Sequence, residues 1–377
     1  MGYRYAVFGL GRQGTAAVYD LLVNCEADGV VGFDPDAGRR DAAERRIRPL
    51  VGQDAPLRVA DAAGCDCQAL AGEVDVVLSC APYRFNPEIT RSCLEAGLPV
   101  CDLGGNPDVV AEQERLAQGK NTPVVPECGL SPGLSNIAAV HLAKEHGVNQ
   151  LIVRCGGLPA DPPDPDVNPL QYKLVFDAQG LISEYSGQCP MLADGRLESV
   201  PACSFVEEFD PEHEAFPTSN NAPQVAEYLR QCGVGDYNYM TVRYHGHWVC
   251  LQGWKALGFL RGDAELDAGL RDLLNASDVL RYDPASDRDK VMLLVRGTRE
   301  GQGLERSWEY RMEVAADPRT GFSAMELTTS WGGTIVAHHL ASGKGRPEGF
   351  ATPERFVDTG WVLGEVDRRL AQVQRPE

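Results

Sequence analysis

The first 130 residues alternate between short apolar runs and amphipathic stretches. The apolar runs lie at 3–8, 29–33, 57–59, 74–80, 99–101 and 122–126, and helical patterns lie between them at 15–22, 37–46, 87–96 and 108–117. The run at 74–80 is continuously apolar, which is typical of a parallel strand covered on both faces. Strands that alternate with helices predict an α/β fold with a parallel sheet.

A different pattern begins near residue 151, where β-like segments are separated by clusters of turn residues. These segments lie at 172–176, 187–191, 205–209, 239–248, 291–297, 308–314 and 322–328. They predict a mixed or antiparallel sheet in a second, α+β domain. The proline-rich stretch 159–169 predicts a rigid loop or a tether.

The C-terminal part of the chain returns to helical periodicity, at 330–340 and over an amphipathic stretch at 355–373. We expect these helices to pack on the first domain, with Gly332 and Gly333 allowing a close approach beside its ligand loop. The predicted organisation is a first domain over 1–130 that is completed by 331–377. A second domain fills 131–330 and begins with a helix capped by Ser131 and Pro132.

The composition narrows the classes of function. The 54 acidic residues outnumber the 35 basic ones, and the net charge of −19 disfavours binding to nucleic acid and anionic membranes. No apolar run approaches the ~20 residues of a membrane span and no leader precedes the first strand, so we expect a cytoplasmic protein. The close pair Cys65 and Cys67 lacks the second pair that a zinc site needs, so no metal is expected.

The turn after the first strand carries a glycine-rich motif, Gly9-Leu10-Gly11-Arg12-Gln13-Gly14. Its position between a strand and a helix is the context that a dinucleotide fingerprint requires. Gly9 permits the tight turn, Gly11 lets the backbone approach a pyrophosphate, and Gly14 lets the helix pack on the strand. The motif therefore predicts a Rossmann-type domain that binds a dinucleotide.

The second strand ends on Asp34, where a carboxylate accepts hydrogen bonds from the adenosine ribose. Because a carboxylate repels a 2′-phosphate, Asp34 predicts NAD as the cofactor. NADP is the alternative if the neighbouring Arg39 and Arg40 turn toward the phosphate.

Several polar side chains follow the strands of the first domain. In an open parallel sheet, ligands bind at the carboxyl ends of the strands. We expect the segment from Ser79 to Tyr83, where the run at 74–80 ends, to face the nicotinamide end of the cofactor through Ser79, Ala81 and Pro82. Tyr83, Asp102 and Cys128 are expected to reach the same rim.

The segment 239–248 has the most informative alternation of the second domain. If it is a strand, Tyr239, Thr241, Arg243, His245 and His247 share one face. That polar face is either exposed to solvent or the floor of a substrate pocket, because antiparallel sheets often leave one face wet.

These motifs, in this order, resemble the saccharopine dehydrogenase family, most closely its lysine 6-dehydrogenase branch. The segments that carry the resemblance are 6–14, 74–86, 97–105, 126–136, 155–159, 216–219, 241–247 and 353–356. The stretch C-G-L-S-P-G-L-S-N at 128–136 is more specific than the glycine motif. The resemblance covers nearly the whole chain and implies a Rossmann domain joined to a mixed α+β domain that forms a homodimer.

The resemblance also implies oxidation of an amine carbon of lysine or a lysine adduct by a nicotinamide cofactor. The most direct version is oxidative deamination of the lysine ε-amine to the 6-semialdehyde. The base should have a pKa near the working pH. His245 is the first candidate by its ordinary pKa, and Asp102 and Glu127 are alternatives if burial raises theirs. Tyr83 is a further catalytic candidate.

Arg243 is predicted to bind the carboxylate of the amino-acid substrate through its planar fork. Four polar side chains of the second domain and one thiol of the first are its expected neighbours, namely Thr241, Tyr239, Thr218, Ser219 and Cys128.

Two other functions stay open at this point. A saccharopine- or carboxynorspermidine-type dehydrogenase would act on a secondary amine and need a further cation, for which Arg154, Arg230 and Lys255 are candidates. A nucleotide-binding regulator would keep the fold without turnover, since function depends on the site rather than on the fold.

Overall fold

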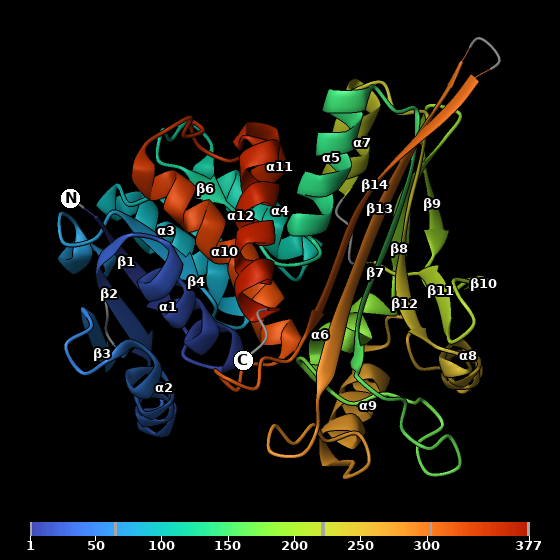
Figure 1. Cartoon of the computed structure of the whole chain (residues 1–377), viewed down its shortest axis with the longest axis horizontal. Coiled ribbons are helices and arrows are strands. Elements are labelled where there is room, and N and C mark those ends of the chain that lie inside the picture. The colour runs from blue at the N-terminus through green and yellow to red at the C-terminus, as the bar shows by residue number, and fades with distance from the viewer. Residues whose placement is uncertain (1, 64–65, 220–222, 302–303, 375–377) are drawn as a thin grey trace. The chain divides into compact units, whose positions relative to one another are not determined.

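The computed structural model describes residues 2–63, 66–219, 223–301 and 304–374 (Figure 1). The chain forms two compact units, Met1–Ile137 with Glu326–Glu377, and Ala138–Met325, which we call unit 1 and unit 2. Unit 1 is thus built from both ends of the sequence.

The sheet of unit 1 has, within the described residues, six parallel strands in the order β3-β2-β1-β4-β5-β6. The strands are β1 (Tyr3–Phe8), β2 (Ala27–Asp34), β3 (Leu57–Asp61), β4 (Val76–Ser79), β5 (Val100–Asp102) and β6 (Val124–Val125). This is the strand order of the doubly wound dinucleotide-binding fold. The parallel sheet predicted from the apolar runs is confirmed, and the carboxyl ends of its strands share one edge.

Helices cover both faces of this sheet. They are α1 (Arg12–Asn24), α2 (Ala37–Val51), α3 (Asn86–Ala96), α4 (Pro107–Ala117), α10 (Ala324–Ser342), α11 (Pro353–Phe356) and α12 (Thr359–Val373), with short 3-10 turns η1 (Cys67–Leu70) and η2 (Tyr83–Phe85). Successive residues of β1 enter two different cores. Tyr5 and Val7 pack with residues of α1 and α10, whereas Ala6 and Phe8 pack with residues of α3. A strand buried on both faces needs this continuous apolar sequence.

The segment after α10 returns to the sheet and extends it beside β6. Val124 donates its N–H to the carbonyl of Gly349 at 2.9 Å and accepts the N–H of Ala351 at 3.1 Å. The segment 349–351 therefore runs parallel to β6 and carries α11 to the carboxyl edge of the sheet.

The C-terminal helices pack on unit 1 as expected. Arg369 of α12 forms a buried ion pair with Asp20 of α1, at 3.0 Å between Nε and Oδ1. A Cβ atom at Gly333 of α10 would lie 2.8 Å from Leu103, and one at Gly332 would overlap the carbonyl oxygen of Gly129. The close approach predicted for these glycines is confirmed, but it is made to the loops after β5 and β6.

Helix α5 (Leu134–His146) begins two residues later than the predicted first position at Pro132. Gly133 has φ +131°, which interrupts helical geometry, and the carbonyl of Gly129 accepts the N–H of Leu134 at 3.0 Å. The residues before the helix form a closed turn, so the predicted cap at Ser131 is wrong.

Within the described residues, unit 2 has a mixed sheet in the order β10-β11-β12-β7-β13-β14. Strand β8 pairs with β12, and β9 pairs with β8. Its strands are β7 (Gln150–Pro159), β8 (Gln188–Ala193), β9 (Arg196–Pro201), β10 (Glu207–Glu208), β11 (His213–Pro217), β12 (Asp236–Tyr244), β13 (Asp289–Gly301) and β14 (Leu304–Ala315). Its further helices are α6 (Ala178–Glu184), α7 (Pro223–Gln231), α8 (His247–Ala256) and α9 (Ala264–Ala276). Only the pair β7 and β12 is parallel among the described pairs, so the predicted mixed sheet is confirmed.

Three predicted strands of the second domain are wrong in part or whole. Residues 172–176 form no strand, and residues 322–328 include the start of α10. That helix begins there because the Asp289 carboxylate accepts the N–H groups of Ala324 and Met325, at 2.7 and 3.0 Å. The strand predicted at 239–248 ends at Tyr244, because Gly246 turns the chain with φ +95° into α8.

The two faces of the unit 2 sheet differ in exposure. On β14, Met312 and Val314 are buried, whereas Glu309, Arg311 and Glu313 are exposed. We call the face that carries Arg311 the open face and the opposite face the covered face. Register places Arg154 of β7 and Leu294 of β13 on the open face beside Arg311.

Candidate functional site

The turn between β1 and α1 is shaped by its glycines. Gly9 has φ +91°, and a Cβ atom there would lie 2.8 Å from the backbone nitrogen of Ala81. A Cβ atom at Gly14 would overlap the carbonyl oxygen of Gly9. A Cβ atom at Gly11 would have no described atom within 4 Å. Gly11 is also the N-cap of α1, and no side chain caps this end of the helix. The turn is closely packed on one side and leaves the helix N-terminus open, as a bound pyrophosphate requires.

Asp34 anchors this turn from the end of β2. Its buried carboxylate accepts the N–H of Leu10 at 2.8 Å and the N–H of Asp36 at 2.9 Å. Arg40 donates to the main-chain carbonyl of Asp34 at 2.5 Å, and Arg39 is exposed. Sequence reasoning placed Asp34 at the ribose but missed this second role in holding the glycine turn.

The remaining residues of the motif lie at the start of α1. Arg12 donates to the buried carboxylate of Glu326 at 2.9 Å. The amide oxygen of Gln13 is buried and has no hydrogen-bond partner among the described residues. An open helix N-terminus beside an unsatisfied amide oxygen fits a dinucleotide with its phosphates and hydroxyl groups.

The loop after β4 follows the same edge of the sheet. Ser79 is buried and donates to the side chain of Asn86 at 2.8 Å. Ala81 is half-buried and Pro82 is exposed. Ser79 thus fixes the start of α3, and its predicted contact with the cofactor stays a prediction, as does that of Ala81 and Pro82.

Asp102 lies at the end of β5 and is 1% exposed. Its Oδ1 accepts the N–H groups of Gly104 at 2.7 Å and Glu127 at 3.4 Å, and its Oδ2 accepts the Gln113 amide at 2.7 Å. Burial raises the pKa of Asp102, although these hydrogen bonds act in the opposite direction. The carboxylate therefore ties the loops after β5 and β6 together, which is a positioning arrangement.

Glu127 follows β6 and has a strained, buried position. Its φ is +63°, a region that residues other than glycine rarely adopt, and it is 5% exposed. Burial, together with the charges of Glu354 and Asp102, raises the pKa of Glu127 from 4.5 to about 8. A buried carboxyl group that titrates near neutral pH at the ligand-binding edge has the properties of a general base.

Cys128 and Tyr83 complete this edge of unit 1. The Cys128 thiol is 1% exposed and faces the carbonyls of Val125 and Pro126, at 3.3 and 3.5 Å. Burial raises the pKa of Cys128 well above its usual range, so the thiol stays protonated at neutral pH. The ring of half-buried Tyr83 lies against Gly105, where a Cβ atom would approach it to 3.2 Å.

Arg243 lies on the covered face of the unit 2 sheet and is 2% exposed. Its Nη2 is 3.3 Å from a carboxylate oxygen of Glu184, and its Nε donates to the Tyr185 hydroxyl at 2.9 Å. The guanidinium also lies over the ring of Tyr172, 4.9 Å from its centre. The solvent-exposed alternative for this face is therefore wrong. The carboxylate that Arg243 binds within the described chain is Glu184, a partner that sequence reasoning missed.

Two of the other predicted substrate-binding residues of unit 2 belong to the same buried network, and two lie beside it in the sequence. The hydroxyl of Thr241 donates to Glu184 and lies 2.7 Å from the hydroxyl of Thr218. Ser219 donates through its side chain to the carbonyl of Ser183 at 2.7 Å, and Tyr239 is 4% exposed. The structure thus brings these residues together around α6.

The two histidines do not continue the polar face, because the strand ends before them. His245 lies in the turn, with 45% of its side chain exposed and its Nδ1 3.9 Å from Glu214. His247 is the first residue of α8 and is buried, with Nε2 3.0 Å from the Tyr185 hydroxyl. Burial and the charge of Arg243 lower the pKa of His247 from 6.5 to about 3.

The cations considered for a second substrate carboxylate have internal partners. Arg154 is paired with Glu207 at 2.7 Å, and Arg230 is paired with Glu227 at 2.8 Å. Lys255 donates to the carbonyl of Ala202.

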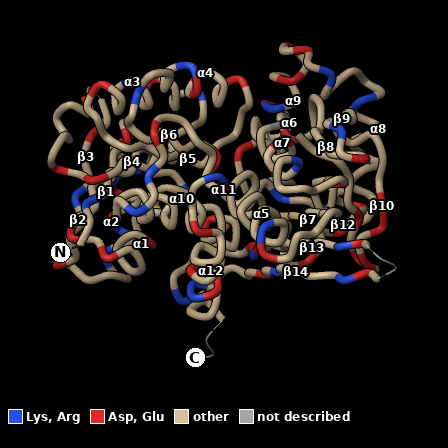
Figure 2. The backbone as a smooth tube through the Cα atoms, turned by 90° about the horizontal axis from the view of Figure 1, so that it is seen from above, with Lys and Arg blue, Asp and Glu red and all other residues tan. Residues whose placement is uncertain are grey.

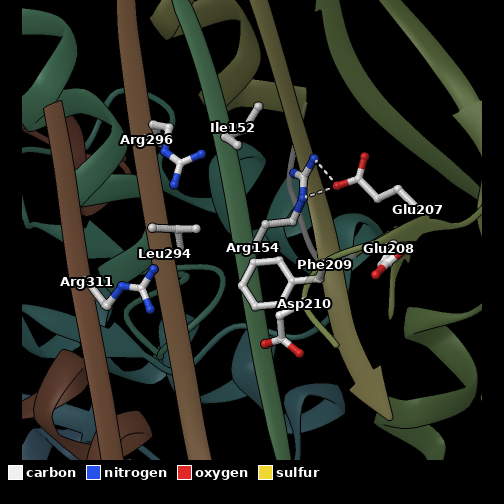
Figure 3. A pocket seen from close by; sticks show the side chains of 9 residues that line it. All are labelled: Ile152, Arg154, Glu207, Glu208, Phe209, Asp210, Leu294, Arg296 and Arg311. Atoms are coloured by element: carbon white, nitrogen blue, oxygen red, sulfur yellow. Dashed lines mark hydrogen bonds and ion pairs between the residues drawn. The ribbon is translucent and has the colours of Figure 1, made fainter. Parts of the chain in front are cut away.

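A pocket of about 260 Å³ lies on the open face of the unit 2 sheet (Figure 3). Its lining residues are Ile152, Arg154, Glu207, Glu208, Phe209, Asp210, Leu294, Arg296 and Arg311. Figure 3 shows the guanidinium of Arg154 turned toward Glu207, across from Arg296 and Arg311 on the neighbouring strands. None of the predicted catalytic residues lines this pocket.

Three further features of the described chain concern its charge distribution, its metal-ligating side chains and the apolar character of its helices. Acidic and basic residues are interspersed along the backbone of both units (Figure 2). In the described part of the chain, no group of three or more His, Cys, Asp and Glu side chains is arranged to hold a metal, and Cys65 lies outside that part. No described helix combines the length and the apolar character needed to cross a bilayer.

Comparison with known proteins identifies relatives that match about half of this chain. The chain is 28% identical over 211 residues to the mitochondrial alpha-aminoadipic semialdehyde synthase of Mus musculus, covering 52% of this chain and 22% of that protein. It is 26% identical over 205 residues to the saccharopine dehydrogenase (NADP+, L-glutamate-forming) of Saccharomyces cerevisiae, covering 53% of this chain and 44% of the yeast protein. The matched stretch therefore spans less than half the length of these relatives.

The fold has a solved counterpart over its whole length. The apo structure of saccharopine dehydrogenase (L-Glu forming) from Saccharomyces cerevisiae matches with a TM-score of 0.74 and 17% identity, over 98% of both chains. Two family models also match, the saccharopine dehydrogenase NADP binding domain over residues 5–124 and the saccharopine dehydrogenase C-terminal domain over residues 129–371. Because the second model alone covers more than half of the sequence, the chain belongs to the saccharopine dehydrogenase family.

Proposed function

We propose that this protein is a nicotinamide-dependent dehydrogenase that oxidises the CH–NH group of an amino acid, with Glu127 as the general base. The observation that carries the proposal is the buried carboxyl group of Glu127, whose pKa is raised to about 8. It follows β6, at the edge where the glycine turn leaves the N-terminus of α1 open. Membership of the saccharopine dehydrogenase family supports the reaction class.

The chemistry divides between cofactor and chain. The bound dinucleotide supplies the hydride acceptor. Glu127 removes a proton from the substrate ammonium, because only a neutral amine can release hydride from its carbon. Asp102 holds the backbone N–H of Glu127 and keeps the carboxyl group at the strand end. Water then adds to the resulting imine carbon, and the carbon–nitrogen bond breaks to give an aldehyde and an amine or ammonia.

For the substrate, we propose the ε-amine of lysine first and the secondary amine of saccharopine second. The second candidate, saccharopine, is favoured because a matched yeast relative is named a saccharopine dehydrogenase. The first is favoured by the internal pairing of Arg154 with Glu207 and of Arg230 with Glu227, because saccharopine brings further carboxylates that require cations. The proposal places Arg243, Thr241, Tyr239, Thr218, Ser219 and Cys128 in substrate binding, and His245 and Tyr83 as further catalytic candidates.

The substrate is tested by following the absorbance of reduced nicotinamide with lysine, saccharopine, ornithine and carboxynorspermidine in turn. Lysine should give the highest kcat/KM. A clear preference for saccharopine would assign the secondary-amine reaction instead. If all four amines are inert while the dinucleotide binds, the dehydrogenase proposal fails and the nucleotide-binding regulator takes its place.

The cofactor preference is a separate prediction. We expect kcat/KM with NAD to exceed that with NADP by roughly tenfold or more. The proposal places Asp34 at the 2′ position of the ribose, and like charges placed together cost several kcal/mol. Steady-state kinetics with both cofactors measures the ratio. The names of the yeast relative and of the family model include NADP. A preference of this protein for NADP would refute the role of Asp34 and point to Arg39 and Arg40.

We also predict a homodimer formed through the open face of the unit 2 sheet. Arg296 and Glu309 are cross-strand partners there, 2.9 Å apart, and Arg311 lies beside the same carboxylate. Alternating charges of this kind can pair with a second copy across a two-fold axis. Light scattering at micromolar concentration should give twice the chain mass, and Arg311→Glu should shift the equilibrium toward monomer. A monomer mass for the wild type would contradict the prediction.

A further inference from the structure

Residues 343–356, which connect α10 to α11 and include α11, form what we call the return segment. This segment brings a second buried carboxylate, that of Glu354, to the carboxyl edge of the unit 1 sheet. Residues 349–351 run beside β6, and Glu354 follows three positions later in α11. Glu127 follows two positions after the end of β6. Because the two backbones are parallel and hydrogen-bonded at Val124, both glutamates arrive at the carboxyl end of the same strand pair.

Glu354 is as deeply buried as Cys128 and more deeply buried than Glu127. It is 1% exposed, and Thr352 donates its hydroxyl to Oε1 of Glu354 at 2.5 Å. Its charge acts on both Glu127 and Cys128. The segment 353–356 contributes to the family resemblance in the sequence, but the sequence pattern predicts no role for Glu354.

The groups around Glu127 come from three elements. Asp102 comes from β5 and is held by three hydrogen bonds. Cys128 is the next residue in the loop after β6, and its buried thiol interacts with that of Cys101 on β5. Glu354 comes from α11. The titratable groups that act on Glu127 are thus acidic, and no described cation is among the causes of its shift.

We propose that Glu354 is a positioning residue for the amine oxidation, acting through Glu127 as the second member of a coupled carboxyl pair. Two buried carboxylates close together resist double ionisation, so the pair retains one proton in the free enzyme. An arriving ammonium group supplies the positive charge that favours the second ionisation. The proton of Glu127 is then released to solvent, and the freed carboxylate takes the proton of the ammonium group. The return segment therefore belongs to the catalytic machinery as well as to the fold. This inference rests on the proposed role of Glu127 as base.

The test is the pH dependence of kcat/KM in Glu354→Gln, Glu354→Asp and the wild type. The wild type should lose activity below an apparent pKa of about 8. Glutamine keeps the hydrogen-bond acceptor for Thr352 but removes the charge, so the acid limb should move to lower pH by about one unit, a tenfold change in proton affinity. Aspartate keeps the charge and should retain the wild-type limb.

Glu348→Gln is the matched control, because Glu348 is an exposed carboxylate on the same return segment. It should leave the limb unchanged. If Glu354→Gln lowers kcat/KM equally at every pH, Glu354 has a structural role only and the proposal is wrong.

A second readout does not depend on turnover. Carbon-13 NMR titration of the Glu127 carboxyl group, assigned with Glu127→Gln, should give a lower pKa in Glu354→Gln than in the wild type. An unchanged titration would refute the coupled pair. A lowered titration without any effect on the rate profile would keep the pair and refute Glu127 as the base, which separates this inference from the proposed function.

Discussion

Glu127→Gln is expected to lower kcat/KM for the amine substrate by roughly 10²–10⁴-fold, the usual contribution of a general base. Glutamine has nearly the same shape and can adopt the same backbone conformation, but it cannot take a proton from the ammonium group. Dinucleotide affinity should change little, because the phosphates are expected at the glycine turn rather than at β6. Steady-state kinetics together with cofactor titration measures both quantities.

The same variant has a signature in stability. The pKa of Glu127 is raised in the fold from 4.5 to about 8 by burial and by neighbouring carboxylates, so the folded state binds a proton that the unfolded state has released. Stability from this group is fully present below pH 4.5 and is lost as the pH rises to about 8. The free energy of unfolding of the wild type should therefore fall relative to Glu127→Gln across this window, by at most about 5 kcal/mol. A difference that does not vary with pH would contradict the buried, protonated carboxyl group.

Arg243→Met is expected to lower the free energy of unfolding by about 3–5 kcal/mol, the cost of removing one partner of a buried ion pair. The carboxylate of Glu184 would keep the Thr241 hydroxyl but lose its cation in a site only 3% exposed. Chemical denaturation measures the change. Unfolding at the wild-type midpoint would show that the pair contributes little.

The double variant Arg243→Met with Glu184→Gln separates stability from substrate binding. Removing both charges should recover part of the stability, because the uncompensated carboxylate is gone. If Arg243 also binds the substrate carboxylate, kcat/KM should stay low in the double variant. If activity returns with stability, Arg243 is structural and its place in substrate binding is refuted.

The parts of the fold that follow local rules were predictable. Continuous apolar runs indicated the parallel strands, since only strands buried on both faces need them. The spacing of Gly9, Gly11 and Gly14 between a strand and a helix indicated the ligand turn. The rule for strand ends predicted that Asp102 and Cys128 lie at one edge of the sheet. Each of these inferences depends on neighbours in the sequence or on a general property of parallel sheets.

Features that depend on distant partners could not be predicted. The covered face of β12 is polar because Glu184, 59 residues away from Arg243, neutralises its charge, and period-two alternation cannot reveal that partner. The alternation itself stops at Tyr244 because a glycine with positive φ turns the chain, which separates His245 from the face. Glu354 comes to the same edge of the sheet as Glu127 only because the C-terminal segment returns beside β6.

The most direct test of the central claim is the pH profile of kcat/KM in the wild type, Glu127→Gln and His245→Gln. We expect an acid limb with an apparent pKa near 8 that persists in His245→Gln and disappears in Glu127→Gln, together with most of the activity. A limb near the ordinary histidine value of about 6.5 that survives in Glu127→Gln and is lost in His245→Gln would contradict the assignment of Glu127 as the base.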